Sequence, residues 1–99
     1  MKQITKAIRE KLIANHKNQD GTKEFKAVLK LFNPTGAGTW YLSELNPETN
    51  VAFGLCYITD KEYGYVDLNE LENFKGALGL GIERDKFFTP KTLEECENL

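Results

Sequence analysis

The sequence predicts an α+β domain in which an N-terminal helix packs on a bent antiparallel sheet of four to five strands. Two patterns indicate this fold: apolar residues recur every four positions near the N-terminus, and four later runs are strand-like in pattern and composition. Short turns separate the runs, so successive strands would pair as an antiparallel meander. With 99 residues, of which 40% are hydrophobic, the chain is expected to form a single domain over residues 1–99.

The N-terminal helix is expected from Thr5 to about Asn15. Ile4, Ile8 and Leu12 would form one apolar stripe along it, which is the face that packs against a core. Thr5 suits the N-cap position because its hydroxyl can accept a hydrogen bond from a free amide of the first turn.

Four strands are expected, over residues 24–32, 39–45, 51–58 and 63–68. The third run is apolar at both odd and even positions, so both of its faces should be covered and it should lie inside the sheet. The bend leaves two forms open, an open sheet or one that closes towards a small barrel.

A short helix is expected near residues 68–75. Asp67 and Glu70 have the spacing of a capping box, and Gly76 suits the position that ends a helix.

A fifth extended segment is expected over residues 80–88, followed by a last short helix near residues 90–97. That helix would begin at Pro90, since proline suits the first helical position, or at Thr92.

The composition argues against several classes of protein. No apolar run approaches the roughly 20 residues of a membrane span, and the first six residues lack the apolar region of a signal peptide, so we expect a cytoplasmic location. Cys56 and Cys96 fit a reducing compartment, and their spacing does not imply a disulfide. The single histidine, His16, has no neighbour in sequence that would complete a metal or general-base site. We therefore expect no metal, no cofactor and no catalytic residue.

The charge is uneven along the chain. Residues 1–34 hold eight basic and three acidic residues, a formal charge of +5, whereas residues 35–99 hold five basic and twelve acidic residues, a charge of −7. The two segments would either interleave within one fold, which packing favours, or form separate faces. A separate basic face would suit a polyanion, and an acidic face would suit a basic protein.

The segment Glu-Arg-Asp-Lys at residues 83–86 mixes charges with flanking core-forming residues. In an extended chain Glu83 and Asp85 would share one face and Arg84 would lie on the other. A buried Arg84 would need a carboxylate partner, because an unpaired buried charge is costly. The structural interpretation is an ion pair that fixes the register of the strand. The functional interpretation is a polar site in which Arg84 clamps a phosphate or carboxylate.

Six motifs, in order, span nearly the whole chain: Ile4-Thr5-Lys6, Thr39-Trp40-Tyr41, Phe53-Gly54-Leu55, the run from Gly64 to Leu71, Leu80-Gly81-Ile82-Glu83-Arg84-Asp85, and Phe87-Phe88-Thr89-Pro90. Together they resemble a bacterial family catalogued as domain of unknown function 2958. The Ile82–Asp85 block is the most specific part, although Gly81 stands where the family typically has proline. The resemblance implies a small cytoplasmic bacterial protein, often encoded on plasmids or other mobile elements, and it supplies no catalytic residue.

The function predicted first is a non-enzymatic accessory module that binds another protein in plasmid or mobile-element biology. Aromatic residues of the sheet have acidic neighbours, which is the wrong sign for a phosphate backbone but suits a protein partner. The candidate interaction surface is Tyr41, Glu44, Tyr65, Glu83, Arg84 and Asp85.

Two alternatives remain open. One is a nucleic-acid-binding module whose basic residues are Lys2, Lys6, Arg9, Lys26 and Lys30. The other is an enzyme with a concave polar site around Glu83, Arg84 and Asp85, with Glu44 or Asp67 nearby.

Overall fold

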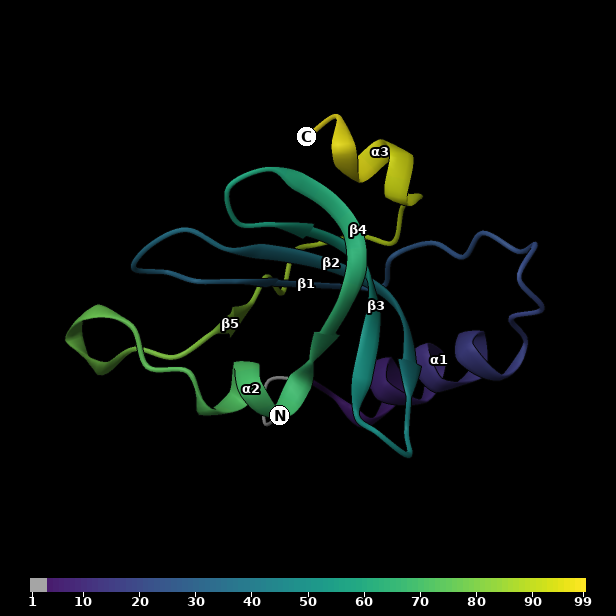
Figure 1. Cartoon of the computed structure of the whole chain (residues 1–99), viewed down its shortest axis with the longest axis horizontal. Coiled ribbons are helices and arrows are strands. Elements are labelled where there is room, and N and C mark those ends of the chain that lie inside the picture. Colours follow the sequence, from purple (N-terminus) through teal and green to yellow (C-terminus); the bar gives the residue numbers. More distant parts are fainter. Residues whose placement is uncertain (1–3) are drawn as a thin grey trace.

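A five-stranded antiparallel sheet lies between two helices in the computed structural model, which describes residues 4–99 (Figure 1). The elements are α1 (Lys6–Lys17), β1 (Leu29–Phe32), β2 (Thr39–Asn46), β3 (Val51–Tyr57), β4 (Lys61–Asp67), α2 (Leu68–Asn73), the 3-10 turn η1 (Ala77–Gly79), β5 (Glu83–Arg84) and α3 (Leu93–Glu97). The strand order is β4-β3-β2-β1-β5. The predicted α+β meander is confirmed, and β3 lies inside the sheet. The sheet stays open and does not close towards a barrel.

The helix α1 covers one face of the sheet, called here the helix face. Its fully buried Leu12 packs in a cluster with Leu42 and Leu45 of β2. The hydroxyl of Thr5 accepts a hydrogen bond from the amide of Ile8 at 3.2 Å, which confirms the predicted cap. No helix within residues 4–99 is long and apolar enough to cross a membrane.

A β-bulge at Ser43 lets β2 contribute to both faces of the sheet. Leu42 pairs with Gly54, and the next pair is Glu44 with Phe53, so Ser43 is the extra residue. The bulge shifts the alternation by one position. Leu42 and Leu45 consequently share the helix face, while Glu44 is on the opposite face beside its partner Phe53.

The opposite face, called here the groove face, is covered along one part by the C-terminal segment. Tyr41, Leu55 and Cys96 are buried there together with Ala27. The helix α3 begins after Thr92, whose side chain and that of Glu95 form a reciprocal capping box, both bonds being 3.1 Å. Of the two predicted starts of the last helix, Thr92 is correct and Pro90 is wrong.

The first strand is shorter than predicted. Residues 24–28 do not extend β1, because Ala27 forms an isolated bridge with Lys91, whose carbonyl accepts the Ala27 amide at 2.8 Å. Ala27 therefore packs on the groove face, whereas Leu29 packs on the helix face. The returning C-terminal segment supplies a local partner and so interrupts the strand.

The fifth strand consists of Glu83–Arg84 alone, not residues 80–88. Before it, η1 turns the chain with Leu78 at φ 61° and Gly79 at φ 71°. After it, Asp85 accepts the amide of Phe87 at 2.9 Å, which bends the chain away from β1. Turns on both sides thus limit the ladder to two residues.

The helix α2 also ends earlier than predicted. The side chain of Asp67 caps it by accepting from the amide of Asn69 at 2.8 Å, not from that of Glu70. The helix stops at Asn73, and Gly76 has φ −88°, so Gly76 is not the left-handed residue that was expected to end it.

Candidate functional site

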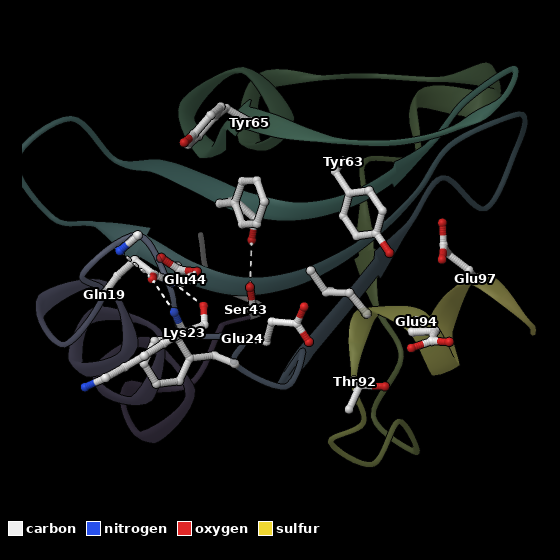
Figure 2. Close-up of a pocket in the computed structure, with 14 residues that line it drawn as sticks. Gln19, Lys23, Glu24, Ser43, Glu44, Tyr63, Tyr65, Thr92, Glu94 and Glu97 are labelled. Carbon is white, nitrogen blue, oxygen red and sulfur yellow. Dashed lines mark hydrogen bonds between the residues drawn. The ribbon is translucent and has the colours of Figure 1, made fainter.

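An open groove of about 620 Å³ occupies the part of the groove face that the C-terminal segment leaves uncovered (Figure 2). It lies between strands β3 and β4, the helix α3 and the loop over residues 19–25. This groove, called here the acidic groove, has an aromatic floor and a rim that is rich in carboxylates.

The floor of the acidic groove is built by cross-strand pairing. Phe53 pairs with Tyr65, and Leu55 pairs with Tyr63, so both tyrosine side chains emerge on the groove face. The rings of Phe53 and Tyr65 are 5.2 Å apart with an interplanar angle of 56°. Tyr63 is 50% exposed and Tyr65 is 76% exposed, so these rings are accessible to a partner.

Three carboxylates from two separate segments surround Tyr63: Glu24 belongs to the loop after α1, whereas Glu94 and Glu97 belong to α3 (Figure 2). Partial burial raises the pKa of the Tyr63 phenol, and so do a hydrogen bond to Glu97 and the negative charges of Glu97, Glu94 and Glu24. The phenol therefore stays a neutral hydrogen-bond donor at physiological pH.

The inner wall of the groove is held by Glu44 and Gln19. Glu44 is only 8% exposed, and the amide of Gln19 donates to its Oε2 at 3.0 Å. The same amide group donates to the carbonyl of Lys23 at 2.8 Å, and the side-chain oxygen of Gln19 accepts the amide of Gly21 at 3.0 Å. One side chain thus fixes both the loop and the carboxylate of Glu44.

The predicted interaction surface falls into three places. Glu44 and Tyr65 line the acidic groove together. Tyr41 is buried, with its ring 5.8 Å from that of Phe88. Glu83 and Arg84 form β5, and Asp85 follows directly after it, at the far edge of the sheet from β4.

A second, shallower hollow of about 570 Å³ lies beside β5. Lys30, Arg84, Asp85 and Phe87 are among the residues that line it, whereas Glu44 and Asp67 are not, so the extended carboxylate set of the enzyme hypothesis is not brought together there. Arg84 Nε is buried without a hydrogen-bond partner among residues 4–99. Its neighbour Asp85 pairs instead with Lys30.

The basic residues of the nucleic-acid hypothesis do not form one free face. Lys6 lies 3.9 Å from Glu10, and Arg9 donates to the side chain of Asn50 at 3.1 Å. Lys30 pairs with Asp85. The contact between Lys30 and Asp85 joins the basic segment to the acidic segment. Lys2 lies outside the described residues.

Lys26 lies near Glu95. Hydrogen bonds from Thr92 lower the pKa of the Glu95 carboxyl, and the charges of Lys26 and Lys91 lower it further. This electrostatic interaction is a second one between a basic residue of the first segment and an acidic residue of the second.

The two thiols are poorly suited to nucleophilic chemistry. Burial raises the pKa of Cys56, and Glu62 raises it further; burial also raises the pKa of Cys96. Within residues 4–99 no three His, Cys, Asp or Glu side chains are placed to hold a metal ion.

Sequence reasoning missed several members of the acidic groove, namely Gln19, Glu24, Phe53, Glu94 and Glu97 as site residues. They come from three segments, the loop over residues 19–25, β3 and α3, and no spacing in the chain links these segments. Only the acidic bias of the C-terminal part and the alternating tyrosines of β4 pointed in this direction.

Comparison with known proteins gives the family of the chain. The family model described as "Protein of unknown function (DUF2958)" matches residues 3–94. No curated protein and no solved structure gave a match. Because the family model covers nearly all of the 99 residues, the chain belongs to the DUF2958 family of proteins of unknown function.

Proposed function

We propose that this chain is a non-enzymatic accessory module that binds another protein by receiving a basic segment of it in the acidic groove. The observation that carries this proposal is the position of Tyr63, half exposed among Glu24, Glu94 and Glu97. Within residues 4–99, none of these three carboxylates forms a salt bridge. Together they would attract a positive charge to an aromatic floor.

A lysine or arginine side chain fits this environment better than other side chains do. Its alkyl stem can pack on the rings of Phe53 and Tyr65, while its charged head reaches a carboxylate at the rim. A cation above an aromatic face gains further electrostatic attraction. The groove thus combines an apolar and an anionic surface for one amphipathic side chain.

The same charges argue against nucleic acid as the partner. Glu24, Glu94 and Glu97 would repel a phosphate backbone that approached the exposed tyrosines. Lys30, which the nucleic-acid hypothesis needs, is partly neutralised by Asp85.

We further propose that the module acts in the cytoplasm of bacteria, in the biology of plasmids or other mobile elements. The motif resemblance described in the sequence analysis supports this setting. The partner would then be a cytoplasmic protein with an exposed basic segment.

The proposal is tested with three blocked synthetic heptapeptides that alternate threonine with lysine, glutamate or glutamine. Binding is followed by amide chemical shifts of the labelled protein. The lysine peptide should shift the resonances of Tyr63, Tyr65 and Glu97, and added salt should weaken its binding. Equal binding of the glutamate peptide, or no binding of the lysine peptide, would refute the proposal.

A pair of matched variants localises the binding. Glu94→Gln with Glu97→Gln should weaken the lysine peptide by about tenfold, the effect of two partly exposed charge pairs of up to about 1 kcal/mol each. Glu48→Gln with Glu70→Gln removes two exposed carboxylates that do not line the acidic groove and should leave the affinity within about twofold.

A further inference from the structure

The strand β4 has one unpaired edge beside the acidic groove. It is the first strand in the order β4-β3-β2-β1-β5, and among residues 4–99 it pairs with β3 alone. The opposite edge of the sheet is β5, whose ladder is only two residues long. Of the two edges, β4 therefore presents the longer row of backbone groups, over the seven residues Lys61–Asp67.

The pairing register shows which residues of β4 direct their backbone groups outward. The amide of Leu68 donates to the carbonyl of Asn50 at 3.0 Å, in line with the ladder that pairs Asp67 with Val51. In an antiparallel ladder, every second pair exchanges hydrogen bonds, and the residues between them point their N–H and C=O groups away. Counting back from Leu68, Tyr63 and Tyr65 are the outward-facing residues.

The outward groups of Tyr63 and Tyr65 are free to bind a further strand. Within residues 4–99, neither residue forms a backbone hydrogen bond outside the sheet. Charged side chains, which often protect an edge from pairing, occur on β4 at Lys61, Glu62 and Asp67, but the central Tyr63-Gly64-Tyr65 has none.

The backbone groups and the side chains of these two tyrosines are therefore both accessible to a partner in the acidic groove. Their side chains form part of the groove floor, and their N–H and C=O groups form the adjoining edge. A residue that paired with either tyrosine would carry its side chain on the same face of the sheet, roughly 5 Å away between Cβ atoms. Its neighbours two positions along would do the same.

We propose that the partner binds by strand addition: an extended segment pairs with β4 as a sixth strand and carries basic side chains at alternate positions. This inference rests on the proposed function and adds the binding mode and the residue pattern of the partner. The basic side chain opposite Tyr63 reaches Glu94 or Glu97, and the one opposite Tyr65 packs beside the Phe53–Tyr65 ring pair.

Amide hydrogen exchange with the lysine–threonine heptapeptide tests the mode directly. In the free protein the amides of Tyr63 and Tyr65 should exchange fast, while those of Glu62 and Gly64, which bond to β3, should exchange slowly. A peptide concentration about ten times the dissociation constant should slow Tyr63 and Tyr65 by about tenfold. Unchanged exchange at these two amides in the saturated complex overturns strand addition.

A proline variant separates the backbone from the ring. Tyr65→Ala removes the ring alone, whereas Tyr65→Pro also removes the outward N–H and leaves the bonds to β3 in place. Strand addition predicts that the proline variant binds about fivefold more weakly than the alanine variant, the effect of one hydrogen bond. Equal affinities of the two folded variants contradict it.

N-methylated peptides provide a test that leaves the protein unchanged. Methyl groups on the amides of one alternating set of peptide residues should abolish binding, and methyl groups on the other set should be tolerated. Equal tolerance at both sets overturns strand addition. If the peptide binds in a way that depends on Glu94 and Glu97 but fails these tests, the groove function stands and the binding mode is wrong. If the unmodified peptide does not bind at all, both proposals fail.

Discussion

Lys30 Nζ lies 3.5 Å from Asp85 Oδ2, and the amide of Asp85 donates to the carbonyl of Lys30 at 3.0 Å, so this pair joins the end of β5 to β1. The ion pair that the sequence suggested for this segment is therefore made by Asp85 and not by Arg84. Both side chains of the pair are partly shielded from solvent, being 25% and 30% exposed.

A double-mutant cycle with Lys30→Met and Asp85→Asn should give a coupling free energy of about 0.5–1 kcal/mol, because partial burial reduces screening. Urea denaturation of the four proteins measures it. The control cycle is Lys6→Met with Glu10→Gln, a pair at 3.9 Å with 90% and 65% exposure, which should couple by about 0.3 kcal/mol or less. Equal coupling in the two cycles would show that the contact between Lys30 and Asp85 does not hold β5.

Substitution by alanine should change the stability of the fold strongly at Gly54 and only slightly at its cross-strand partner Gly64. A Cβ at Gly54 would lie 1.9 Å from the carbonyl oxygen of Tyr41 and 2.9 Å from Leu42 Cα, whereas a Cβ at Gly64 would meet nothing within 4 Å. Gly54→Ala should destabilise the fold by about 3 kcal/mol or more, since the obstacle is backbone. Gly64→Ala should change the unfolding free energy by less than about 1 kcal/mol. Similar losses in both variants, measured in urea, would mean that the two strands are not packed in this way.

The capping box of α3 makes the stability of the protein depend on pH in the acidic range. Thr92→Ala should cost about 1 kcal/mol at neutral pH, and Thr89→Ala, outside the helix cap, should cost much less. Hydrogen bonds from Thr92 hold the pKa of Glu95 below its ordinary value of 4.5 in the folded state. This contribution is present above pH 4.5 and is lost as the pH falls through the lower, folded-state pKa.

Thermal melts of the wild type and of Glu95→Gln between neutral pH and pH 3 check this acid dependence. The wild type should lose more stability than the variant over the acid part of the range. Parallel curves would show that Glu95 has the same pKa in the folded and unfolded chains.

The ionisation of Tyr63 should report the charge of the acidic groove. Its phenol has a pKa above the ordinary value of 10, through partial burial and then through Glu97 and its neighbours. In an ultraviolet titration, the absorbance difference between wild type and Tyr63→Phe reports the Tyr63 phenol, which should ionise above pH 10. Glu97→Gln should lower the pKa of this phenol towards 10. Because the folded-state pKa is raised, the associated stabilisation is complete below pH 10 and is lost as the pH rises from 10 through the higher folded-state pKa. If the pKa of Tyr63 is unchanged in Glu97→Gln, the carboxylate of Glu97 does not lie beside the phenol.

The sheet was predictable because its strands have a clear local pattern. The sequences of β2 and β3 are long apolar or alternating runs that lie between turn residues. The helix α1 has an N-cap residue and an apolar stripe. The limits of the shorter elements were not predictable, because they depend on segments that are distant in the sequence. The chain at Ala27 leaves the β1 ladder for Lys91, which no local pattern around Ala27 contains.

The candidate site was predictable only in part, for the same reason. Glu44 and Tyr65 were identified from their residue types and do share the acidic groove. Tyr41 was expected on the surface, but Phe88 and α3 cover it once the C-terminal segment folds back. Glu24, from a loop, and Glu94, from α3, both approach Tyr63, and the sequence alone could not place these two segments together.

The single extra residue at Ser43 has a consequence for redesign of this protein. Because it resets the alternation of β2, the wall of the groove at Glu44 can be changed without altering which side chains face α1. Deleting Ser43 would restore regular alternation, because Glu44 would then follow Leu42 directly while keeping its partner Phe53, and Leu45 would stay on the helix face. A substitution at Glu44 and a deletion of Ser43 would therefore both keep the same side chains of β2 against α1.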